Sequence, residues 1–202
     1  MKYIIFDLEF NAPFKIDRKT KQLKRGNTNP LCPQEIIEIG AVKVSEEFEI
    51  EDTFQQFVRP QLYLKLHPKV KSKTQISLED IQGGRAIDEV ICLFRSWIGV
   101  EDYLLCSWGS DDINELKRNC KYFKINTDWI DGFKDIQKSS MKILNLPMSQ
   151  QLGLKRALEI LEIPIDSKFH KALNDSIYTA KILKKISAKT SIENEELHQN
   201  NK

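Results

Sequence analysis

The sequence predicts an α/β fold in which a mixed central β-sheet is flanked by α-helices. Two observations carry this prediction. Strand-like apolar segments follow one another closely in the first third of the chain, and later strand candidates alternate with segments whose apolar residues have helical spacing. The length of 202 residues, with 41% hydrophobic and 30% charged residues, suits one globular domain.

The first predicted strand is the segment YIIFDLEFN, an apolar run interrupted by Asp7 and Glu9. Successive side chains of a strand point to opposite faces, so these two carboxylates share one face. Such a run is typical of a central strand covered on both sides, where an unpaired carboxylate is costly to bury. Three explanations remain open: a salt bridge to Lys or Arg, a solvent-exposed strand end, or a divalent metal ion.

The remaining elements follow from apolar periodicity and turn residues. Further strands are predicted at residues 35–44, 53–60 and 103–110, and a short strand precedes a helix within residues 128–145. Helices are predicted at residues 77–84, 86–99, 111–123, 153–163 and 172–187. The polar segment between residues 12 and 34 is predicted to be a loop.

We place the domain at residues 1–187 and predict that the polar tail, residues 188–202, is disordered. The chain has no apolar run of the roughly 18 residues that a membrane helix needs, and its N-terminus meets acids too early for a signal peptide. A cytoplasmic protein without a membrane partner is therefore expected. The four cysteines form no CxxC pair, which favours reduced, mostly buried thiols.

Other acids occur where strands give way to helices. Asp111 and Asp112 follow the predicted strand at residues 103–110, and Asp175 lies near the start of the last helix, five residues after His170. Each alone is more typical of a helix cap than of a functional site.

Taken in order, the segments FDLEF, SWGSDD and HKALND resemble the motifs of the DEDD-type 3′-to-5′ exonucleases of the ribonuclease-H-like fold. The segments PQEIIEIGAVKV, FVRP and FHKALNDSIYTAKIL are similar to the branch that contains the KapD-like sporulation inhibitors and the eukaryotic RNA-trimming exonucleases. The resemblance covers roughly residues 1–186.

The resemblance implies that Asp7, Glu9, Asp112 and Asp175 hold two divalent metal ions, Mg²⁺ or Mn²⁺, and that His170 is the general base. Asp112 is preferred because the branch pattern resembles WGxxD, with Asp111 as the alternative. Lys171 stands where a tyrosine-type site would place Tyr, so the site resembles the histidine type, DEDDh. Two departures from the pattern are Asn11, where relatives often have Thr, and residues 131–151, which show no clear family signature.

Such a site implies hydrolysis of a phosphodiester at the 3′ end of a single strand, with release of nucleoside 5′-monophosphates. Two metal ions stabilise the attacking and leaving oxygens, and a histidine with a pKa near 6.5 can take the proton of water close to neutral pH. We expect His170 and Glu9 to act at the reacting water.

Binding of a single strand requires basic side chains and aromatic platforms. Phe10 and Phe14 adjoin the acidic strand and are candidates to flank the terminal base, although Phe10 suits the core better. The basic stretch with Lys69, Lys71 and Lys73 fits a phosphate-binding surface or simply a solvated lysine-rich loop. The resemblance favours RNA over DNA. The alternative function is a regulatory nucleic-acid- or protein-binding module that retains the exonuclease fold.

Overall fold

The computed structural model describes residues 1–199, and the side chains of residues 1–188. Its main sheet has five strands in the order β5-β4-β1-β6-β7. These strands are β1 (Lys2–Asn11), β4 (Glu35–Val44), β5 (Ile50–Phe57), β6 (Tyr103–Ser107) and β7 (Phe133–Asp135). β1 pairs antiparallel with β4 and parallel with β6, so the predicted mixed sheet is confirmed.

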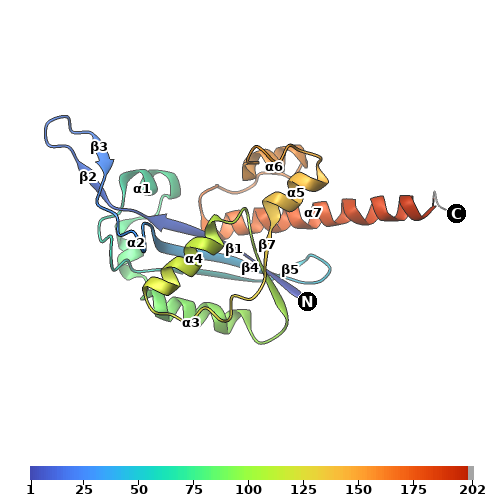
Figure 1. Cartoon of the computed structure of the whole chain (residues 1–202), viewed down its shortest axis with the longest axis horizontal. Coiled ribbons are helices and arrows are strands. Elements are labelled where there is room, and N and C mark those ends of the chain that lie inside the picture. The colour runs from blue at the N-terminus through green and yellow to red at the C-terminus, as the bar shows by residue number, and fades with distance from the viewer. Residues whose placement is uncertain (200–202) are drawn as a thin grey trace.

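Helices cover both faces of this sheet (Figure 1). They are α1 (Pro68–Thr74), α2 (Leu78–Gly83), α3 (Ile87–Ile98), α4 (Asp111–Tyr122), α5 (Ile136–Ile143), α6 (Leu154–Ile160) and α7 (Ala172–Gln199). α3 and α4 pack on one face, whereas α5, α6 and α7 pack on the other. The α/β fold class predicted from the sequence is therefore confirmed.

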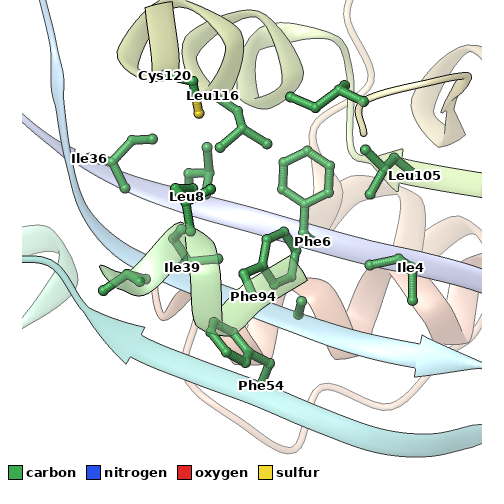
Figure 2. Close-up of a cluster of buried hydrophobic side chains, with 14 of the residues drawn as sticks. Ile4, Phe6, Leu8, Ile36, Ile39, Phe54, Phe94, Leu105, Leu116 and Cys120 are labelled. Atoms are coloured by element: carbon green, nitrogen blue, oxygen red, sulfur yellow. The ribbon is translucent and has the colours of Figure 1, made fainter. Parts of the chain in front are cut away.

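The alternation of β1 divides the hydrophobic core into two layers. Phe6 and Leu8 enter the cluster beneath α3 and α4, where the Phe6 and Phe94 rings lie 6.4 Å apart (Figure 2). Ile5 points the other way, into the cluster beneath α7. Burying apolar groups on both faces fixes the register of β1, because a slip of one residue would exchange every side chain between the faces.

Two segments differ from the expectations. The predicted loop at residues 12–34 contains a hairpin, β2 (Phe14–Ile16) with β3 (Leu23–Arg25), and the lysine-rich stretch forms α1. α7 is described as far as Gln199. The domain boundary at residue 187 and the disorder of the tail stay predictions. Residues 200–202 lie outside the described residues.

The capped helix predicted from Ser77 is confirmed, with a capping box between Ser77 and Asp80. The cysteines are free, and three of the four are buried, as expected. Within residues 1–199, no helix combines the length and apolar character required to cross a membrane.

Candidate active site

The acidic face of β1 lies against the N-terminal end of α7. Asp7 pairs with Gly40 of β4, and Glu9 pairs with Glu38, so both carboxylates stand beside the central antiparallel pair of strands. A side chain at position 40 would collide with α7, since a Cβ there would lie 2.1 Å from the Leu173 nitrogen. Ser176 of α7 contacts β4 at the same place, because its hydroxyl donates a hydrogen bond to the Gly40 carbonyl at 2.8 Å. Gly40 thus allows α7 to descend onto the sheet next to Asp7.

α7 and the residues before it contribute His170 and Asp175. His170 has a φ of +63°, which is uncommon outside glycine, and its backbone N–H donates to Asp175 Oδ2 at 3.1 Å. The other carboxylate oxygen, Oδ1, is buried and has no hydrogen-bond partner among the described residues. Ligand atoms of Glu9, His170 and Asp175 all lie within 4.8 Å of one another.

Asp112 is positioned by the chain that follows β6, the parallel neighbour of β1. After β6 the chain turns at Gly109, whose φ is +87°, and enters α4. Asp112 is 8% exposed, and its carboxylate accepts a hydrogen bond from the Leu8 backbone N–H. Asp111 is exposed. The geometry favours Asp112 over Asp111 as the residue that faces β1.

Burial and mutual repulsion make these acids unusually reluctant to ionise. Desolvation raises the pKa of Asp112 to about 8 and that of Asp175 to about 6. The pKa of Glu9 rises to about 7, because of burial and then the nearby Glu38. For Asp7, burial followed by the charges of Asp112 and Asp175 raises the pKa well above its ordinary range.

The pKa of His170 is lowered, which favours the neutral imidazole. Partial burial, followed by the charge of Lys73, lowers the pKa of this imidazole below its ordinary 6.5. Lys73 also opposes the increases in pKa of Glu9 and Asp175. A neutral imidazole can accept a proton at neutral pH, which is the state that a general base requires.

Glu38 is a further acid at the site that the sequence reasoning missed. It is fully buried, and its two oxygens accept from Gln55 Nε2 at 2.6 Å and from the Ala172 N–H at 3.4 Å. The carboxylate therefore binds the first turn of α7 while repelling a negative charge on Glu9. Its position opposite Glu9 follows from the pairing of β1 with β4, which a single sequence does not disclose.

The aromatic candidates lie in different environments. Phe10 is partly buried and packs against the core cluster beneath α3 and α4, so its position agrees with the core alternative. Phe14 begins the β2–β3 hairpin, and its ring meets His67 edge to face with centroids 5.2 Å apart. Trp108 is held by the bond from its indole N–H to the Leu152 carbonyl at 2.9 Å.

The three candidate lysines are all exposed on α1, but they do not form one surface. Residues four apart share a helix face, whereas residues two apart do not, so Lys69 and Lys73 point together and Lys71 points elsewhere. Lys73 is the one whose charge acts on Glu9, His170 and Asp175.

α1 is held in place by two buried polar side chains. Asn11 donates to the Tyr63 and Lys65 carbonyls at 2.7 and 3.1 Å and accepts from the His67 N–H at 3.0 Å. The Glu35 carboxylate accepts from three successive N–H groups of residues 61–63. Asn11, which departs from the family pattern, thus fixes the segment that leads to Lys73.

The donor set fits divalent metal ions. Several buried and half-buried carboxylates lie together with raised pKa values, and one oxygen of Asp175 lacks a partner among the described residues, so they need positive charge to become anionic. Carboxylate oxygens are the ligands that Mg²⁺ and Mn²⁺ prefer. Glu9, His170 and Asp175 form a group that could hold a metal ion, and Asp7 and Asp112 are acids beside it.

Comparisons with known proteins agree with this arrangement. Residues 4–183 match the family model described as Exonuclease (RNase_T). The probable 3′-5′ exonuclease KapD of Bacillus subtilis is 28% identical over 151 residues, which is 74% of this chain and 72% of KapD. Human 3′-5′ exoribonuclease 1 is 31% identical over 166 residues, and the match spans 76% of this chain but only 46% of the human protein.

A solved structure gives the same result. The nuclease domain of 3′hExo, described as a DEDDh family member bound to rAMP, superposes with a TM-score of 0.78 at 26% identity, covering 93% of this chain and 92% of that domain. The resemblance drawn from the sequence is confirmed, and the chain belongs to the exonuclease family as a 3′-5′ exonuclease of the DEDDh type.

Proposed function

We propose that the protein removes nucleotides from the 3′ end of single-stranded nucleic acid, preferably RNA, and releases nucleoside 5′-monophosphates. The observation that carries the proposal is the convergence of Glu9, His170 and Asp175 within 4.8 Å, beside Asp7 and Asp112. The preference for RNA is supported by relatives named 3′-5′ exoribonuclease 1 and by a 3′-exonuclease structure that recognises a histone mRNA stem-loop.

In this proposal, Asp7, Glu9, Asp112 and Asp175 hold two divalent ions, Mg²⁺ or Mn²⁺. When bound, these ions offset the negative charge that develops on the phosphate during an in-line displacement. Asp7 is placed among the other three, since the charges of Asp112, Asp175 and Glu9 all act on its carboxylate.

His170 takes the proton of the attacking water, and Glu9 orients that water. A water molecule can contact both side chains, because their ligand atoms lie within 4.8 Å of each other. Neutral His170 is ready to accept the proton, and the φ of +63° together with the N–H bond to Asp175 holds its backbone in place. Lys73 is positioned to attract a phosphate toward the acids.

The test uses single-stranded RNA and DNA of one sequence, labelled at the 5′ end and incubated with Mg²⁺, Mn²⁺ or a chelator. We expect labelled products that shorten one nucleotide at a time, faster on RNA, and no shortening with chelator. Asp7→Asn and His170→Ala should each reduce the rate by at least about a hundredfold. Asp111→Asn is the matched control, because this neighbouring carboxylate is exposed, and it should stay close to wild type.

Binding of both oligonucleotides without shortening under any metal would contradict the proposal and favour the alternative of a regulatory binding module. Equal loss of activity in Asp111→Asn and Asp112→Asn would contradict the assignment of Asp112.

A further inference from the structure

The β2–β3 hairpin, residues 14–25, is a strongly basic arm that leaves the body of the protein directly after β1. Figure 1 shows it projecting beyond the sheet and helices. The arm has one acid, Asp17, and six basic residues: Lys15, Arg18, Lys19, Lys21, Lys24 and Arg25. Within the described residues its one ion pair is internal, between Lys24 and Asp17. Five positive charges are therefore left for a partner outside the chain.

The arm is built to hold its shape. Asp17 Oδ1 accepts from the N–H groups of Lys19 and Thr20 at 2.9 Å each, and Oδ2 accepts from Lys24 Nζ at 2.6 Å. At the base, the Gly26 N–H donates to the Pro13 carbonyl at 3.0 Å, and a Cβ at position 26 would lie only 2.8 Å from the Phe14 nitrogen. An ordered arm loses less conformational entropy on binding than a flexible loop would.

The base of the arm and the start of α1 border an open cavity of about 430 Å³. Its polar lining includes Lys24, Arg25, His67 and Lys69, and Pro13 and Leu23 add apolar wall. No acidic side chain of the described residues lines it. The cationic side chains of such a cavity suit the phosphates of a nucleotide, and its apolar wall suits the sugar and base faces. A ligand without negative charge would leave the cations without a partner.

We propose that the basic arm and this cavity form a second binding site, which holds the phosphate backbone of the strand several nucleotides upstream of its 3′ end. Phe14 lies five positions after Glu9 in the sequence, which at about 3.3 Å per residue places the start of the arm roughly 16 Å beyond the acids. The proposal rests on the proposed function for the location of the 3′ end. It predicts that affinity rises with strand length as the strand reaches the arm.

The test measures binding of 5′-labelled oligouridylates in chelator, so that no hydrolysis occurs. A trinucleotide is compared with a strand of about twelve nucleotides, within the length range of single-strand sites. The arm variant is Arg18→Gln/Lys19→Gln/Lys21→Gln, which leaves the Asp17–Lys24 pair intact. The matched control, Lys121→Gln/Lys155→Gln/Lys185→Gln, removes the same charge from exposed positions on α4, α6 and α7.

We expect wild type to bind the longer strand more tightly than the trinucleotide, and the arm variant to lose about tenfold in affinity for the longer strand. The slope of log affinity against log salt should become shallower by about 2, as expected when three single-strand phosphate contacts are lost. The control variant should stay within about twofold of wild type, because a net-charge effect alone is small at physiological salt.

Equal losses in the arm and control variants, or an arm variant that binds the longer strand as wild type does, would overturn the proposal and leave the arm to a protein partner. Hydrolysis by wild type is followed in parallel with Mg²⁺. Its absence would overturn the proposed function and not the binding site, so the two failures are distinguishable.

Discussion

The two faces of β1 make opposite contributions to the protein. On one face, Phe6 and Leu8 are buried in an apolar cluster, where they stabilise the fold. On the other, Asp7 and Glu9 lie near Asp175 and Glu38, and burial followed by these charges raises the pKa values of both. A single strand can thus separate stability from function through its alternation alone, because burial on the apolar face offsets the energetic cost of the acidic face.

The largest change in the free energy of unfolding is expected from a substitution on the apolar face of β1. Phe6→Ala removes a ring that is 1% exposed, and it should lower the free energy of unfolding by about 3 to 5 kcal/mol. In chelator, Asp7→Asn should change stability in the opposite direction by about 1 to 3 kcal/mol, since it removes an acid whose ionisation is opposed by burial and by neighbouring carboxylates. Urea denaturation measures both, and a destabilised Asp7→Asn would contradict the contrast.

The next effect concerns the junction of the acidic face with α7. Gly40→Ala places a methyl group against the Leu173 backbone, so α7 must shift, at a cost of about 1 to 3 kcal/mol. Because α7 carries Asp175, the loss of activity should be greater than the loss of folded protein alone would cause. Gly83→Ala is the matched control, since a Cβ there meets nothing within 4 Å. If the two variants were equally active at the same folded fraction, the close approach of α7 to Gly40 would not be needed to position Asp175.

A smaller effect appears when the pH is varied without metal. The pKa values of Asp175, Glu9 and Asp112 are raised to about 6, 7 and 8, so the folded state binds these protons more tightly than the unfolded state does. Stability should therefore be highest near pH 4 and should decline as the pH rises to about 8. Thermal unfolding in chelator should show a decrease in Tm of the order of 5 °C over this range. Mg²⁺ should reverse the decrease at pH 8, and a flat profile in chelator would contradict this electrostatic account.

The smallest effect is on His170. Lys73→Gln removes a positive charge that lowers the pKa of His170, so that pKa should rise toward its ordinary value, by a few tenths of a unit. NMR titration of the imidazole measures the change directly, with Lys71→Gln as the control because Lys71 points away from Lys73 on α1. An identical pKa in both variants would show that Lys73 does not act on His170.

Much of the fold was predictable because the strongest local signals coincide with the real elements. The residues of β4, Glu35–Val44, were predicted within the same bounds, and the alternation of Phe6 and Asp7 gave the two faces correctly. The hairpin was missed because β2 and β3 have three residues each, which is too short for a strand pattern to be recognised in a polar segment. α1 was missed because its seven residues carry three lysines and a proline in place of an apolar stripe.

The site was predictable as a set of residues but not as an arrangement. Asp7 and Glu9 were visible because acids are unusual in an apolar strand. The roles of Glu38 and Asn11 depend on which distant groups they meet: Glu38 reaches Ala172, and Asn11 reaches the backbone near Tyr63. Contacts between residues so far apart in the chain arise from sheet pairing and helix docking, which a single sequence does not encode locally.

The most direct test of the central claim, that the acidic face of β1 is built for divalent ions, is a calorimetric titration with Mn²⁺ at pH 7.5. We compare wild type with Asp7→Asn, Asp112→Asn and the exposed control Asp111→Asn. We expect wild type and Asp111→Asn to bind Mn²⁺ alike, whereas Asp7→Asn and Asp112→Asn should lose most of the binding. Absence of Mn²⁺ binding to wild type, or unchanged binding by Asp7→Asn, would contradict the central claim.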